Sequence, residues 1–202
     1  MNVALRGDNQ VIYQSKTAST FAPASRRNFI GTGGKLSALA VAFLVGSERM
    51  AKGASPSPGD VGILNTALGL EYQGIAAYQV GAESKLLKPA TLKVAVQFQS
   101  DHKKHAEALA STIVKLGGTP VSAMKPADYN FPTSKLKTEA DVLKFAAGLE
   151  GGAVSAYLGA VPAFADRELA KVAASILGNE AQHLSLLRSA LGENPDPTAF
   201  VS

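Results

Sequence analysis

The chain has 202 residues, of which 46% are hydrophobic and 18% charged, so it can bury one good core and a single domain is expected. Its net charge of +4 is unevenly placed, because residues 1–53 carry a net +5 and residues 54–202 a net −1. Without a basic stripe in the body or any tryptophan, the composition excludes nucleic acid as an expected partner, and the lack of cysteine excludes disulfides and thiolate metal sites.

Residues 1–53 carry a segment typical of an export signal. Residues 25–30 read S-R-R-N-F-I, and an apolar run follows at residues 36–46. That run is shorter than the roughly 20 residues that a helix needs to cross the bilayer core, so we interpret residues 1–53 as a twin-arginine signal segment. The twin-arginine translocase is then an expected partner, and the protein is periplasmic or otherwise exported. The cleavage point is poorly defined, so an uncleaved, membrane-tethered form stays open.

Two long helices are expected after a Ser/Pro/Gly linker at residues 54–59. The first runs from about Asp60, its expected N-cap, to Leu86. The second begins at Pro89, a favoured first-turn residue, and ends at the glycine pair at residues 117–118.

A second helix pair is expected beyond a proline-containing loop of about twenty residues. The third helix begins after Thr138 and bends or ends at Pro162, and the fourth begins after Asp166 and ends at Gly192. Short connections within each pair and a long crossover between the pairs predict an all-α, ferritin-like four-helix bundle. The expected domains are the signal segment (1–53), the linker (54–59), the bundle (60–192) and a C-terminal tail (193–202).

Six glutamate and histidine residues fall where a two-metal site between four helices needs them. Two helix pairs repeat the spacing, with 79 residues separating the two first-helix glutamates and 78 separating the matching positions of the second helices. Residues three apart on a helix share a face, and carboxylates buried among small apolar residues need a compensating cation. We predict two divalent transition-metal ions, iron or manganese, bound by Glu71, His102, His105, Glu150, Glu180 and His183.

Position 102 departs from the doubled pattern, which requires glutamate there. His102 can ligate in its place, giving three carboxylates and three imidazoles, which leaves a net +1 with two divalent ions. The alternatives are Asp101, which lies on the same side of the helix as His105, or a site that uses neither residue and is mononuclear or empty.

Two tyrosines follow the first-helix glutamates at the same distance. Tyr78 lies seven residues after Glu71, and Tyr157 lies seven residues after Glu150. Seven residues make about two turns, so both phenols are expected beside the site, as hydrogen-bond donors or as catalytic one-electron donors. The alternative is that both are ordinary core tyrosines.

Several stretches of the mature chain resemble the exported ferritin-like domain family, a branch that is also similar to plant desiccation-related proteins. They are residues 70–72, 105–109, 116–120, 129–132, 149–150, 156–160, 176–183 and 194–197. The resemblance implies Glu71, His105, Glu150, Glu180 and His183 as metal ligands. It implies the fold and the metal site more strongly than any one reaction.

Three classes of function are compatible with these expectations. The favoured one is a redox enzyme that acts on oxygen or peroxide, either ferroxidase-like or peroxide-detoxifying, with a small oxidant or metal ion as substrate. Buried ligands beside two tyrosines exceed what structural metal binding needs. The alternatives are a non-catalytic metal-binding or storage protein and a stress-associated structural protein. A homodimer stays open.

Overall fold

The computed structural model describes residues 57–201, so the expected signal segment and residues 54–56 of the linker lie outside the described residues. Within that part the chain is all-helical and has no strand. The four long helices are α2 (Pro58–Glu83), α3 (Pro89–Lys115), α4 (Glu139–Ala160) and α5 (Arg167–Ala190). Short 3₁₀ turns lie at Pro126–Tyr129, Thr133–Lys135 and Val161–Ala163. The four-helix architecture expected from the sequence is confirmed.

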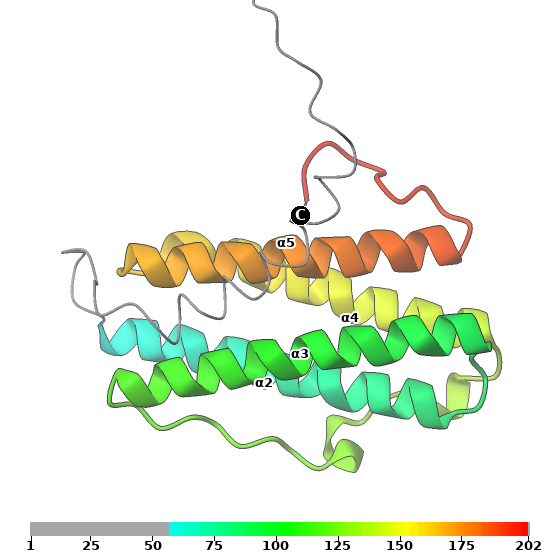
Figure 1. Ribbon diagram of the computed structural model, residues 1–202, viewed down its shortest axis with the longest axis horizontal. Coiled ribbons are helices and arrows are strands. Elements are labelled where there is room, and N and C mark those ends of the chain that lie inside the picture. The colour runs from blue at the N-terminus through cyan, green and yellow to red at the C-terminus, as the bar shows by residue number, and fades with distance from the viewer. Residues whose placement is uncertain (1–56, 202) are drawn as a thin grey trace, which may run out of the picture. The chain divides into compact units, whose positions relative to one another are not determined.

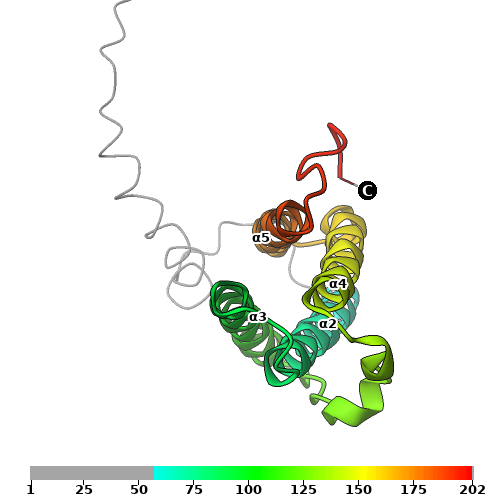
Figure 2. The same cartoon turned by 90° about the vertical axis from the view of Figure 1, so that its right-hand side faces the viewer.

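The helices form two antiparallel pairs, α2 with α3 and α4 with α5 (Figure 1). Seen end-on, α2 lies beside α4, and these two helices run in opposite directions (Figures 1 and 2). The crossover at residues 116–138 returns along the bundle to start the second pair. Asn65 of α2 binds the first part of this crossover. Its side-chain amide donates to the Thr119 carbonyl at 3.1 Å and accepts from the Val121 N–H at 2.8 Å.

The start of α2 differs from the expectation. Ser57, and not Asp60, is the N-cap, because the Ser57 hydroxyl accepts from the Asp60 N–H at 3.2 Å and the Asp60 carboxylate accepts from the Ser57 N–H at 2.8 Å. This reciprocal pair is a capping box, with Pro58 at the first helical position. Asp60 is buried and also accepts from the Ala165 N–H at 2.8 Å, so it ties the start of α2 to the segment before α5.

The starts of the second helix pair agree with the sequence. Thr138 and Asp141 form the capping box of α4. Asp166 caps α5, since its carboxylate accepts from the N–H groups of Glu168 at 2.7 Å and Leu169 at 3.3 Å. Beyond Ala190 the described tail contains no further helix.

The bundle core is divided along its length into two apolar clusters, with charged side chains buried between them. The larger cluster lies toward the N-terminus of α2 and includes Leu68, Ile113 and Ile176. The smaller cluster lies toward the C-terminus of α2 and includes Phe98 and Leu187. None of the described helices is long and apolar enough to cross a membrane.

Candidate metal centre

All six predicted ligands point into the middle of the bundle, between the two apolar clusters. Glu71 comes from α2, His102 and His105 from α3, Glu150 from α4, and Glu180 and His183 from α5. Glu180 is completely buried, the side chain of His105 is 16% exposed, and the other four are at most 3% exposed. The structure therefore brings together every residue that the spacing pattern selected.

The first donor group consists of Glu71, His102, His105 and Glu180, with donor atoms within 4.8 Å of one another. Oε2 of Glu71 lies 2.8 Å from Nδ1 of His102 and 3.4 Å from Nδ1 of His105. Oε1 of Glu180 lies 3.0 Å from Nδ1 of His105. Two carboxylates and two imidazoles thus enclose one position.

The second donor group consists of His102, Glu150, Glu180 and His183, again within 4.8 Å. Oε1 of Glu150 lies 3.4 Å from Nε2 of His102 and 3.4 Å from Nδ1 of His183. Oε2 of Glu180 lies 3.3 Å from Nδ1 of His183. Glu180 therefore offers one oxygen to each group, and His102 offers one ring nitrogen to each.

Five buried polar atoms of these side chains make no hydrogen bond, although four of them lie 3.0–3.4 Å from a group of opposite charge. They are Nδ1 of His105, Oε2 of Glu150, both carboxylate oxygens of Glu180, and Nδ1 of His183. Buried polar atoms are normally paired, and leaving one unpaired costs about 1–3 kcal/mol. Carboxylate oxygens and imidazole nitrogens are ligands that suit manganese and iron. The unpaired atoms and their chemistry fit a pair of bound transition-metal ions.

Position 102 is filled by an inward-pointing histidine, while Asp101 lies outside both donor groups. The side chain of Asp101 is 21% exposed and accepts hydrogen bonds from Gln97 and from Lys104. Its Oδ2 lies 3.8 Å from Nε2 of His183, whereas Glu150 lies near the other ring nitrogen, Nδ1. At this distance Asp101 makes no hydrogen bond to His183, and its carboxylate is held by Gln97 and Lys104 instead.

The two tyrosines cross the bundle to reach the opposite glutamates. The Tyr157 hydroxyl on α4 donates to Oε1 of Glu71 at 2.5 Å, and the Tyr78 hydroxyl on α2 donates to Oε1 of Glu150. Burial, reinforced by the adjacent carboxylate, raises the pKa of each phenol well above its ordinary value. Both side chains are therefore protonated donors beside the site.

The imidazoles lower the pKa values of Glu71 and Glu150, and the neighbouring carboxylates raise the pKa values of the three imidazoles. Burial alone would raise the pKa of Glu71, but the imidazoles of His102 and His105 outweigh it and lower the pKa to about 2. Burial would lower the pKa of His102, but Glu150 and Glu71 raise it to about 11, and Glu180 and Glu71 raise the pKa of His105 to about 9. In the metal-free protein the six side chains favour ion pairs.

Two residues that the sequence analysis missed contact the ligands. The Phe98 ring stacks on His183 with 3.9 Å between ring centroids. Gly74 lies against the His102 imidazole so closely that a Cβ there would stand 3.0 Å from its Cε1 and Nδ1 atoms. Phe98 could have been found from its position four residues before His102, on the same face of α3.

Comparisons with known proteins agree with this architecture. Residues 59–193 match the family model described as "Ferritin-like domain". A conserved hypothetical protein of Mycobacterium tuberculosis aligns with a TM-score of 0.60 and 22% identity, over 70% of this chain and 96% of that one.

Two further solved structures are similar. Dps from Listeria monocytogenes aligns with a TM-score of 0.56 and 15% identity, over 69% of this chain and 97% of that one. The bacterioferritin-related protein of Bacteroides fragilis, described as a dodecameric thioferritin, aligns with a TM-score of 0.54 and 22% identity, over 77% and 93%. At these identities the structures establish the fold. No match was found among curated proteins.

Proposed function

The chain belongs to the ferritin-like domain family, and we propose from this that it binds two iron or manganese ions and uses them in a redox reaction with oxygen or peroxide. The observation that supports the proposal most is the pair of donor groups that share Glu180 and His102. Each group combines two carboxylates with two imidazoles, and five of their buried atoms make no hydrogen bond. These are the residues that would hold the ions.

The protein side chains have separate tasks in this proposal. Bound iron or manganese supplies the electrons that oxygen or peroxide accepts. Tyr78 holds one oxygen of Glu150 and Tyr157 holds one oxygen of Glu71 by hydrogen bonding, which limits the rotation of each carboxylate. The nearly complete burial of Glu71, Glu150 and Glu180 keeps bulk water away from the site.

A non-catalytic metal-binding or stress-associated structural protein is the rival. In a structural site, metal binding energy is folding energy, so the fold depends on the ion. Here the three imidazoles pair with the three carboxylates, and the pKa of each imidazole is raised. The charges of the metal-free site can therefore balance one another. This supports a bundle that folds without the ions and uses them for chemistry.

The test combines metal loading with one ligand substitution. Anaerobic loading with ferrous iron or manganese should give two ions per chain, and the loaded protein should consume oxygen or peroxide. Glu150→Ala should abolish turnover and reduce the bound metal while the far-ultraviolet spectrum stays helical. Glu107→Ala, at an exposed position of α3, is the matched control and should behave like the wild type.

The outcomes separate the two functions. Fewer than about one ion per chain contradicts the two-metal site, which needs both donor groups filled. A loaded protein that binds two ions and consumes neither oxidant, and whose melting temperature falls sharply when a chelator is added, supports the structural role instead.

We also propose that the chain is exported by the twin-arginine translocase. The S-R-R-N-F-I motif and the net +5 of residues 1–53 support this, against a net −1 in the remaining chain. Arg26→Lys combined with Arg27→Lys should leave the protein folded and confine it to the cytoplasm. Normal recovery of the double variant from the periplasm would contradict the proposal.

A further inference from the structure

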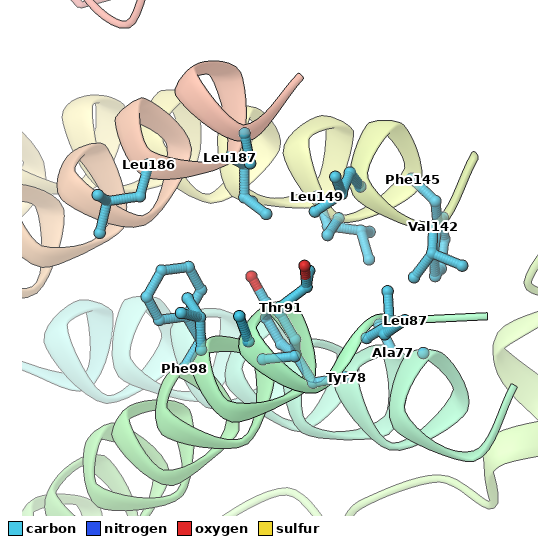
Figure 3. Close-up of a pocket in the computed structure, with 17 residues that line it drawn as sticks. Ala77, Tyr78, Leu87, Thr91, Phe98, Val142, Phe145, Leu149, Leu186 and Leu187 are labelled. Carbon is cyan, nitrogen blue, oxygen red and sulfur yellow. The ribbon is translucent and has the colours of Figure 1, made fainter. Parts of the chain in front are cut away.

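One end of the bundle contains a cavity that the metal site does not use. Its volume is about 280 Å³, and all four long helices contribute to its wall (Figure 3). The interior of a well-packed protein contains few voids larger than a water molecule. This hollow is larger than such voids and opens to solvent, and concave apolar pockets are the usual sites of small-ligand binding.

The cavity breaks the approximate symmetry of the bundle. Tyr157 and Tyr78 are equivalent in the two helix pairs, and each marks one end of the polar site. Around Tyr157 the core contains large side chains, such as Leu109 and Ile113. Around Tyr78 the small side chains of Ala77, Ala95 and Ala146 leave the space unfilled. The cavity of Figure 3 thus lies at the end of the bundle that contains Tyr78.

The lining of the cavity is almost entirely apolar and therefore favours an apolar ligand. Of the 17 lining residues, Tyr78 and Thr91 alone have polar side chains. The Tyr78 hydroxyl donates to Glu150, and the Thr91 hydroxyl donates to Glu139 at 2.6 Å. Because both hydroxyls already donate their protons elsewhere, they can offer a ligand only acceptor lone pairs, and most polar groups inside the cavity would be buried without a partner. A hydrocarbon group incurs no such cost.

The volume of the cavity and the chemistry of its opening further limit which ligands can bind. An apolar cavity of about 150 Å³ holds one benzene molecule. At about 280 Å³, this cavity has room for nearly twice that volume, such as a short alkyl chain or an alkyl-substituted aromatic ring. Val94 and Leu186 also line the cavity and are 43% and 56% exposed, so the opening to solvent is apolar as well.

The inner wall is in direct contact with the metal centre. Phe98 stacks on His183, and Tyr78 donates its hydroxyl to Glu150. In Figure 3 the Tyr78 and Phe98 side chains lie along the same side of the cavity. A ligand in the cavity would touch these two rings, each of which touches one side chain of the second donor group.

We propose that the cavity binds a small apolar molecule, an alkyl or aryl hydrocarbon group, against Tyr78 and Phe98. In this position it would lie against the two rings that contact His183 and Glu150. The binding itself does not rest on the proposed redox function, because the cavity wall contains none of the six metal-site residues.

The test titrates the full-length protein with two probes, benzene and n-butylbenzene. Binding is measured by NMR of the aromatic side chains. Both probes should bind saturably and shift the ring signals of Tyr78 and Phe98, while those of Tyr157 stay unchanged. Ala95→Leu fills the cavity from α3 and should weaken binding at least about tenfold, which corresponds to about 1.4 kcal/mol. Val96→Leu, at a 52% exposed neighbour that does not line the cavity, is the matched control and should bind as the wild type does.

A second filling variant keeps the test decisive if Ala95→Leu fails to fold. Ala146→Leu fills the cavity from α4, the opposite wall, and should have the same effect. The proposal is overturned if the wild type shows no saturable shift at Tyr78, or if a helical filling variant binds both probes with unchanged affinity. Metal content is measured separately, so loss of the redox proposal and loss of the cavity proposal are distinguishable.

Discussion

The hydroxyl of Tyr157 on α4 lies 2.5 Å from Oε1 of Glu71 on α2. The reverse contact also exists, because Tyr78 on α2 donates to Glu150 on α4. Each helix carries a glutamate followed seven residues later by a tyrosine, and the two helices run in opposite directions (Figure 1). Antiparallel packing therefore places each phenol opposite the glutamate of the other helix, which links the two helix pairs across the site.

The first prediction concerns this contact. Tyr157→Phe removes the donor to Glu71 and frees that carboxylate to rotate, so binding at the first donor group should weaken. Loss of an outer hydrogen bond to a metal ligand typically costs about 10–100-fold in affinity. Competition with a metal-binding dye measures the change. Tyr72→Phe, beside Glu71 in sequence and packed at the edge of the large apolar cluster, is the control and should leave metal affinity unchanged.

Local sequence signals predicted the helices because their causes are local. Thr138 with Asp141 and Asp166 before α5 cap their helices as expected. The true cap of α2 was readable too, since Ser57 and Asp60 have the same spacing as Thr138 and Asp141. The prediction failed there because the Pro-rich stretch was assigned to the linker, although proline is well tolerated in the first helical turn.

Other features depend on packing between distant segments and had no local signal. The tyrosines were expected beside the site, but their crossing to the opposite glutamates depends on the directions of α2 and α4. The cavity arises where Ala77, Ala95 and Ala146 meet from three helices, and each alanine alone is an ordinary helix residue. The inward direction of His102 likewise depends on the space left by Gly74.

The second prediction is that the metal-free protein loses stability as the pH rises above neutrality. The pKa of His102 is raised from 6.5 to about 11, and that of His105 from 6.5 to about 9. A raised pKa contributes stability that is complete below pH 6.5 and is lost as the pH rises through about 9 and then 11. The pKa of Glu71 is lowered to about 2, so its contribution is present above pH 4.5 and is lost as the pH falls toward 2.

Thermal melts of chelator-treated protein from pH 5 to pH 10 measure this dependence. The melting temperature should be highest near pH 5 to 6.5 and should fall steadily toward pH 10. His102→Gln should flatten the alkaline part of the profile, because the group with the most strongly raised pKa is then absent. A metal-free wild type whose melting temperature is constant from pH 6.5 to pH 10 contradicts the ion pairs.

The third prediction addresses position 102 directly. His102→Glu restores the residue that the doubled pattern requires, so four carboxylates and two imidazoles balance two divalent ions. The variant should bind the second ion more tightly and retain metal better after oxidation, when the charge of the ions increases. Metal content after oxidation and gel filtration measures retention. Asp101→Asn, which changes a carboxylate outside both donor groups, should alter retention much less.

The last prediction compares two glycines of α2 that differ in their surroundings. In an exposed helix, replacing glycine with alanine typically stabilises by about 1 kcal/mol. Gly69→Ala should show this gain, because no atom lies within 4 Å of the added Cβ beyond the helix itself. Gly74→Ala should lose it, because the Cβ would stand 3.0 Å from the His102 ring and force the imidazole away from Glu71. Metal-bound Gly74→Ala protein should therefore show lower occupancy and a lower melting temperature than Gly69→Ala. Equal metal content in the two variants would show that His102 can move without weakening the site, and that Gly74 is not needed to position it.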